Sequence, residues 1–473
     1  MSNLINEPII LNPKYKFKDD LDRICMYSVH NPNYTEGQDW ISFIHPYQAV
    51  LLSVFSEVSP LEKNLTIIAK KFNTTVNKAF EIIKPYVENP TPVYTELEGN
   101  TVRFPKNVLI HAKDINSQDI SPITIPDVTY NSVNLTDDRM HRAPNSLLWM
   151  LTSQCITNCA YCYADKTTHY TPMSKEIAFD IVNQAYDLGI NYIDVIGGEI
   201  FAHPYWDELI SKIISYGMSP SYISTKIPVT NNIIRKLEKS NYSNVIQFSL
   251  DSLSPDIINK TLRPSSTSYA KAMKDGILML DKAGYMTQIN TILTSDTSTI
   301  DNINELAVFI AKITNLKYWE IRIPDAPMHN ARVSFNRIKA TRSQLEKIID
   351  YIKNNIMKSF HGRIILSHEA LDETFHSTSP DEPCFKTGLC GMLTNRMFVL
   401  PDGKVVPCEE FYWHPDFIIG DLTLQNIESV WQSEKAIKLF KMGQDMYRDQ
   451  SPCKRCSFFE DCSTKKEDVI LKS

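Results

Sequence analysis

Short apolar runs alternate with amphipathic segments from residue 145 to about residue 324. The apolar runs predict strands at 147–152, 191–196, 220–224, 244–250, 286–293 and 317–323. The amphipathic segments repeat apolar residues at helical spacing and predict helices near 173–188, 204–217, 230–240, 268–284 and 300–314. This alternation is typical of a parallel α/β sheet, whose ligands bind beyond the carboxyl ends of the strands. We therefore expect the functional residues where these strands end.

Residues 1–112 follow a different pattern, in which strands precede helices. The strands are expected at 23–28 and 39–44, the helices at 46–57, 60–72 and 75–87, and a hairpin at 92–104. Strands, three helices and a hairpin make a winged-helix pattern. Many winged helices bind nucleic acid, but this segment carries eleven Lys/Arg and twelve Asp/Glu. Without a basic excess it lacks the charge that follows a phosphate backbone, so we expect no nucleic-acid partner.

The rest of the chain divides by composition. Residues 113–144 are rich in Asp, Asn, Ser, Thr and Pro and are expected to form a linker before the sheet domain at 145–335. Residues 336–380, with a helix at 343–357 and a strand at 363–367, form a bridging region. Residues 381–473 contain the last six cysteines.

The apolar, aromatic and charged fractions of the chain are those of an ordinary soluble protein. Its 473 residues suggest roughly two to four domains. The formal charge of −6 is mild. The first residues lack a signal-peptide pattern and no apolar run is long enough to span a bilayer, so we expect a cytoplasmic protein without a membrane partner. Nine of the ten cysteines lie in clusters, which in a cytosolic chain indicate metal sites before disulfides.

The first cysteine cluster directly follows the first strand of the sheet domain. Cys155, Cys159 and Cys162 fall within eight residues. An iron–sulfur cluster normally takes four cysteine ligands, so three on one short loop predict one iron left for a non-protein ligand. The alternative is a structural zinc site, which would need a fourth ligand such as His169.

The C-x3-C-x2-C spacing, with Tyr161 before the third cysteine, resembles the signature loop of the radical S-adenosylmethionine (SAM) enzymes. The resemblance implies a partial (β/α)6 barrel and a [4Fe-4S] cluster whose open iron is chelated by SAM. It also implies that an electron from the cluster cleaves SAM to a 5′-deoxyadenosyl radical. In this family Gly197, Gly198 and Glu199 match the G-G-E motif that binds the SAM amino group. Glycines permit close approach, and a carboxylate accepts hydrogen bonds from an ammonium group.

Further cofactor-binding candidates are polar residues near strand ends. Ser249 and Asp251 follow the family pattern for contacts with the ribose or carboxylate of SAM, and an arginine could pair with the carboxylate. The competing interpretation is helix capping for Ser and Asp and a scaffold or surface role for Arg. The full set of cofactor-binding candidates is Tyr161, Gly197, Gly198, Glu199, Ser224, Ser249, Asp251, Arg263 and Arg322.

The C-terminal cysteines resemble the SPASM extension, which carries auxiliary [4Fe-4S] clusters in many radical SAM enzymes. The matching cysteines are Cys384, Cys390, Cys408, Cys453, Cys456 and Cys462. No cysteine follows Cys462 at the expected position, so six thiols cannot fill two four-cysteine clusters. They could form two clusters with open or non-cysteine sites, which we favour, or one cluster as in twitch extensions; structural zinc is the third possibility.

Glu409 and Glu410 directly follow Cys408. In the sulfatase-maturing relatives an aspartate at this place takes a substrate proton, which makes Glu409 a candidate catalytic base. Solvated surface glutamates are the competing interpretation.

The combination of winged helix, radical SAM barrel and SPASM extension resembles enzymes that modify ribosomally made precursor peptides. In them the winged helix is a RiPP recognition element, which binds the precursor's leader. The resemblance implies thioether or carbon–carbon cross-linking, with a flavodoxin or ferredoxin as electron donor. The alternatives are a radical SAM dehydrogenase acting on a protein side chain or small molecule, and a non-catalytic zinc-binding adaptor or winged-helix regulator.

Overall fold

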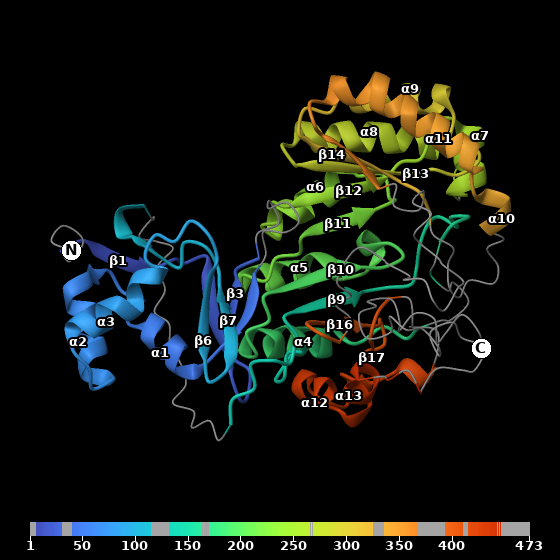
Figure 1. Cartoon of the computed structure of the whole chain (residues 1–473). Helices are drawn as coiled ribbons and strands as arrows, with labels where there is room; N and C mark the ends of the chain where they lie inside the picture. Colours follow the sequence, from blue (N-terminus) through green and yellow to red (C-terminus); the bar gives the residue numbers. More distant parts are fainter. Residues whose placement is uncertain are drawn as a thin grey trace. The chain divides into compact units, whose positions relative to one another are not determined.

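The computed structural model describes residues 6–30, 40–114, 132–162, 164, 170–264, 266, 268–324, 335–367, 393–409, 415–441, 443 and 445. The chain divides into two compact units, Met1–Ala143 and Pro144–Ser473 (Figure 1). Within the described residues, no helix has the length and apolar character that a bilayer crossing requires.

The first unit contains the expected strands, three helices and hairpin. An antiparallel sheet joins β2 (Tyr15–Asp19), β3 (Ile24–Ser28) and β4 (Ile41–Ile44) in that order. Helices α1 (Pro46–Ser53), α2 (Leu61–Lys71) and α3 (Val76–Ile83) follow, and then the hairpin β6 (Val93–Leu97) and β7 (Asn100–Phe104). A second sheet of β5 (Ser59–Pro60), β1 (Pro8–Leu11) and β8 (Leu109–His111) was not anticipated.

Local sequence explains where these helices begin. His45, at the N-cap of α1, forms a capping box with Gln48 in the first turn, and Pro46 between them has a fixed φ that suits the first helical position. The hydroxyl of Thr75 accepts from the amide of Lys78 at the start of α3. The helices and sheets then share one apolar core, which includes Ile44, Leu52 and Phe104.

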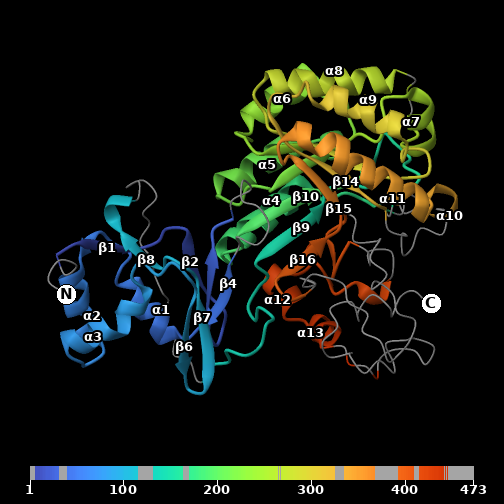
Figure 2. The same cartoon turned by 45° about the horizontal axis from the view of Figure 1, so that its top comes forward.

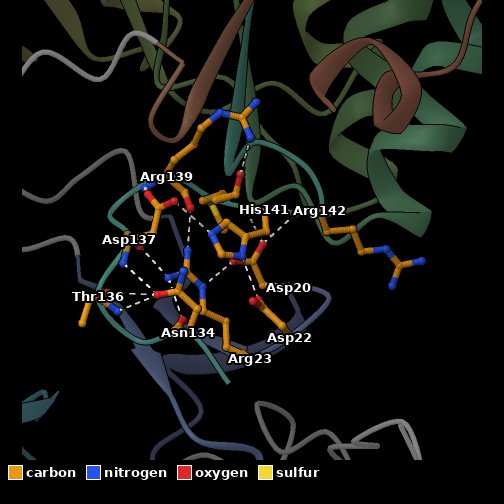
Figure 3. A network of polar contacts seen from close by, with 10 residues as sticks. Asp20, Asp22, Arg23, Asn134, Thr136, Asp137, Arg139, His141 and Arg142 are labelled. Atoms are coloured by element: carbon orange, nitrogen blue, oxygen red, sulfur yellow. Dashed lines mark hydrogen bonds and ion pairs between the residues drawn. The ribbon is translucent and has the colours of Figure 1, made fainter. Parts of the chain in front are cut away.

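Residues 134–142, which we expected in a linker, are attached to the turn between β2 and β3. The buried Arg23 guanidinium pairs with Asp20 at 2.9 Å. Asp20 in turn accepts the main-chain amides of His141 and Arg142 at 2.8 and 2.9 Å. Figure 3 shows Arg23 reaching into this segment, where it donates to the carbonyl groups of Asn134, Asp137 and Arg139. The segment is therefore held inside the first unit by buried polar contacts, which the loop-like composition does not reveal.

The second unit contains all six strands expected for the α/β domain. They are β9 (Ser146–Met150), β10 (Tyr192–Ile196), β11 (Tyr222–Thr225), β12 (Val245–Ser249), β13 (Thr287–Ile292) and β14 (Leu316–Arg322). β9 and β10 pair in parallel, and β11 to β14 form a second parallel set that β15 (Ile364–Ser367) extends. The expected partial barrel is confirmed.

Helices connect these strands and cover one face of the sheet (Figures 1 and 2). They are α4 (Lys175–Asp187), α5 (Trp206–Ser215), α6 (Asn231–Lys239), α8 (Tyr269–Lys282) and α9 (Ile300–Ile310), with α11 (Arg342–Tyr351) before β15. Hydroxyl groups of Ser174, Thr230 and Thr299 cap α4, α6 and α9. The short helix α7 (Pro255–Thr261) was not anticipated.

The C-terminal part extends the first of these sheets. β16 (Arg396–Val399) pairs in parallel with β9, on the side opposite β10. β17 (Lys404–Val406) and β18 (Gly420–Asp421) continue the sheet in antiparallel order, and α12 (Ile427–Trp431) and α13 (Glu434–Phe440) follow. Cys408, two residues after β17, is thereby held on a hairpin joined to the barrel strand that leads into the first cysteine loop.

Candidate active site

The first cysteine loop begins where β9 ends and places two of its three thiols beside one hydroxyl. Oγ1 of Thr157 lies 3.2 Å from Sγ of Cys155 and 3.4 Å from Sγ of Cys159. The amide of Cys162 donates to the carbonyl of Cys159 at 3.2 Å, which turns the chain back. Burial raises the pKa of Cys159 to about 11, and the nearby Lys226 ammonium opposes that rise. Three thiols on one short loop are the ligand set that an iron–sulfur cluster with one open iron would use.

The zinc alternative needs side chains that converge on one ion. Among the described residues, which include the three cysteines of this loop, no three His, Cys, Asp or Glu side chains come close enough to bind a single metal ion. His169, the fourth ligand that a zinc site would use, lies outside the described residues.

The C-terminal end of α7 and the residues that follow it bind the loop through main-chain hydrogen bonds. The amide of Asn158 donates to the carbonyl of Leu262 at 2.9 Å, and that of Ala160 donates to Thr261 at 2.7 Å. Arg263, a candidate for the SAM carboxylate, has a left-handed φ of 49° and an exposed side chain whose Nε donates to the carbonyl of Lys260. This segment therefore supports the loop through its main chain. Sequence reasoning missed that role because main-chain pairing requires no particular side chain.

Gly197 and Gly198 follow β10 and pack directly against the cysteine loop. The amide of Gly198 donates to the carbonyl of Thr152 at 2.7 Å. A Cβ atom on Gly198 would lie 2.2 Å from the carbonyl oxygen of Gln154, and one on Gly197 would lie 2.7 Å from that of Thr152. Both glycines are required by the close approach of two backbone segments.

Glu199 is 1% exposed and is fixed by three donors. It accepts from the Thr225 hydroxyl at 2.8 Å, from the Lys226 amide at 2.7 Å and from the Phe201 amide at 3.4 Å. Burial raises the pKa of Glu199, while these hydrogen bonds oppose the rise. Burial alone would lower the pKa of Lys226, but Cys159 and Glu199 raise it above its ordinary value. The sequence indicated Ser224, in β11, as a cofactor-binding candidate. In the structure the next two residues, Thr225 and Lys226, contact Glu199.

Asp251 joins the cysteine loop to the sheet. Its Oδ2 accepts from the Tyr161 hydroxyl at 2.5 Å, and its Oδ1 accepts from the amide of Ile292 at 3.0 Å. The residue is fully buried, and burial raises the pKa of Asp251 to about 6 against the effect of the Tyr161 hydrogen bond. Both carboxylate oxygens are thus engaged inside the protein, at the place where we expected a contact with SAM.

The remaining candidates are spread along the strand ends. Ser224 accepts from Nε2 of Gln247 at 3.0 Å, and Ser249 is half-buried at the end of β12. The largely exposed Arg322 lies 3.5 Å from Glu320. Glu409 accepts from the Cys408 thiol at 3.5 Å. The candidates outside the described residues are Cys384, Cys390, Glu410, Cys453, Cys456 and Cys462.

Two family models match the chain. The radical SAM superfamily matches residues 149–310, and the SPASM iron–sulfur cluster-binding domain matches residues 390–457. The chain is 22% identical to the mycofactocin maturase MftC of Mycolicibacterium smegmatis over 68% of its length and 77% of the relative. It is 22% identical to the PqqA peptide cyclase of Rhizobium meliloti over 66% of its length and 79% of the relative.

Solved structures extend the similarity to nearly the whole chain. SuiB of Streptococcus suis bound to S-adenosylmethionine has a TM-score of 0.62 at 12% identity, covering 96% of this chain and 94% of SuiB. SuiB bound to its precursor peptide SuiA has a TM-score of 0.61 at the same coverage. At this identity the likeness shows a shared fold.

Proposed function

This chain belongs to the radical SAM superfamily and carries a SPASM iron–sulfur domain, and from this we propose that it modifies a ribosomally made precursor peptide. The modification would use the 5′-deoxyadenosyl radical formed by reductive cleavage of SAM. The observation that carries the proposal is the cysteine loop, gathered at the end of β9 and packed against the G-G-E segment at the end of β10.

The residues at the strand ends fit the two cofactors of this domain. Cys155, Cys159 and Cys162 would hold the [4Fe-4S] cluster, which when bound and reduced supplies the electron for SAM cleavage. An ionised carboxylate has about four lone-pair sites, and Glu199 uses three of them for protein donors. The remaining site suits the ammonium group of SAM. Lys226, placed beside the three thiols, would offset part of their negative charge.

The peptide substrate is supported by the relatives and by the first unit. The relatives include a mycofactocin maturase and a PqqA peptide cyclase, and SuiB has been solved in complex with its precursor peptide. β4 is an outer strand of its sheet, and α3 exposes Val76 and Ile82. A leader peptide could add a strand along β4 and place apolar side chains against α3. It would displace the weak 3.4 Å contact from Arg103 to the carbonyl of Ile41.

The SPASM domain takes auxiliary iron–sulfur clusters, and Cys408 would be one of their ligands. We place the reaction in the cytoplasm, where thiols stay reduced and a flavodoxin or ferredoxin could supply electrons. The product would be a thioether or carbon–carbon cross-link. A radical dehydrogenase is the second candidate, because Glu409 places a carboxylate 3.5 Å from the Cys408 thiol, where a general base could act.

Co-expression tests the proposal. The gene would be expressed anaerobically with each short open reading frame beside it, and each peptide would be analysed by mass spectrometry. We expect one peptide to lose two hydrogens only with the unmodified enzyme, not with a variant that has alanine at Cys155, Cys159 and Cys162. Fragmentation then separates a cross-link, which suppresses cleavage between the joined residues, from a dehydrogenated side chain. A protein that carries zinc and leaves SAM intact under dithionite would contradict the proposal.

A further inference from the structure

The face of the sheet opposite the helices carries polar side chains on four neighbouring strands. Helices cover the other face (Figures 1 and 2). Ile246, Ile289 and Trp319, which alternate with the polar positions along the strands, are fully buried. On the opposite face the strands present a row of polar residues, which we call the amide row: Ser224, Gln247, Gln288, Asn290 and Glu320. The register places Ser224 beside Gln247, Gln247 beside Gln288, and Asn290 beside Glu320.

Hydrogen bonds join the amide row from strand to strand. Nε2 of Gln247 donates to Ser224 at 3.0 Å. Nε2 of Gln288 donates to Oε1 of Gln247 at 3.1 Å, to Oδ1 of Asn290 at 2.7 Å and to Oε2 of Glu320 at 3.3 Å. Gln247, Gln288 and Asn290 are 9%, 3% and 7% exposed. The interior of a barrel usually holds branched apolar residues, so three buried amides here need an explanation.

Glu320 determines which way each amide points. An ionised carboxylate only accepts hydrogen bonds, so the NH2 group of Gln288 must face it. The oxygens of Gln247 and Asn290 face the same NH2 group, whose two hydrogens are shared among three acceptors. The NH2 group of Gln247 is consequently directed to Ser224, and that of Asn290 is directed away from the row.

Two polar atoms of the row remain without a partner in the described part of the chain. They are Oε1 of Gln288, an acceptor, and Nδ2 of Asn290, a donor. The two residues are separated by one position on β13, so both side chains leave the same face roughly 7 Å apart along the strand. Neither atom belongs to the fully buried unpaired atoms of the described residues, so both have access to solvent although their side chains are largely buried. A ligand on this face of the sheet can therefore reach both atoms.

We propose that Gln288 and Asn290 bind amide groups of the peptide substrate, with Oε1 of Gln288 accepting an N–H and Nδ2 of Asn290 donating to a C=O. The inference rests on the proposed function and names the substrate chemistry that this face of the barrel recognises. Peptide main chain and the side chains of Asn and Gln carry the same groups, and both sources suit the pair. Glu320 acts as a positioning residue, because its carboxylate accepts from Gln288 and fixes the direction of that amide.

An amide-to-ester scan tests this assignment. The probe is the peptide identified by co-expression, synthesised with one ester bond at each position of its modified region in turn. An ester lacks the N–H donor, so at the recognised position kcat/KM of the unmodified enzyme should fall about fivefold, as for one neutral hydrogen bond. The same ester should cost nothing further in Gln288→Leu, which has already lost the acceptor. A parallel series replaces each Asn and Gln of the peptide by Leu, and sensitivity there instead identifies a side-chain amide.

Controls keep the outcomes separate. Asn354→Leu removes an exposed amide elsewhere and should retain the full ester effect. Asn290→Ala provides a second variant if Gln288→Leu does not fold, and the ester scan of the unmodified enzyme needs no variant. The inference is overturned if neither peptide series shows a sensitive position, or if Gln288→Leu and Asn290→Ala keep the full effect. Failure of the proposed function would differ, because the unmodified enzyme would then not turn over the parent peptide at all.

Discussion

Replacing Asp251 by Asn should change how stability depends on pH. Asp251 is fully buried and connects the cysteine loop, through Tyr161, to the amide of Ile292 on β13. Asn has nearly the same shape and can still accept from Ile292, while its NH2 group can donate to the tyrosine oxygen. The substitution therefore removes the titrating group and keeps the link between the loop and the sheet.

The expected magnitude follows from the raised pKa of Asp251. Burial raises this pKa from 3.8 to about 6, so the folded protein holds a proton that the unfolded chain has released. Between these two values the folded state binds more protons, and its stability falls as the pH rises. The contribution is fully present below the unfolded pKa and is lost as the pH rises through about 6. Two pKa units correspond to roughly 3 kcal/mol.

Urea unfolding of the metal-free protein between pH 4 and pH 7.5 measures the effect. The free energy of unfolding of the unmodified protein, minus that of Asp251→Asn, should fall by roughly 2.5 kcal/mol across this range and then level off. Asp350→Asn, at an exposed helical position, should give a nearly constant difference. A constant difference for Asp251→Asn as well would refute the reasoning, because the buried carboxyl would then titrate as it does in the unfolded chain.

Three further predictions concern the cofactors and the peptide. Alanine at Cys155, Cys159 and Cys162 should abolish dithionite-driven formation of 5′-deoxyadenosine. The variant should still contain the iron and sulfide of one or two auxiliary clusters. A variant that contains zinc and no iron would instead indicate a structural zinc site at the C-terminal cysteines. Gly198→Ala should weaken SAM binding at least tenfold in equilibrium dialysis, because the alanine Cβ would lie 2.2 Å from the carbonyl oxygen of Gln154. An unchanged affinity would show that the cysteine loop can move at little cost in free energy. Replacing Phe43 by proline removes a main-chain donor from β4, where the leader is proposed to add a strand. The turnover of the full-length precursor, divided by that of the leaderless precursor, should then fall toward one. An unchanged ratio would mean that the leader binds elsewhere.

The sequence by itself determined the order of elements and the place of the chemistry. Alternation of buried strands with amphipathic helices is a local property of the chain, so the six barrel strands and their helices could be predicted within a few residues. The cysteine loop and the G-G-E segment were recognisable because their chemistry depends on close spacing along the chain. β1, β2 and α7 were missed, because short elements carry too few residues for a periodic signal and gain their stability from tertiary partners.

The tertiary structure decided what each polar residue contacts. Asp251 could be expected at a strand end, but only the fold brings Tyr161 and the amide of Ile292 to its two oxygens. Arg263 supports the cysteine loop through main-chain groups that every residue type possesses, so its identity gave no signal. Gln247, Gln288 and Glu320 come from three strands and interact only because parallel pairing sets them side by side. Such contacts depend on register and burial, and these are properties of the whole sheet that no short segment of sequence contains.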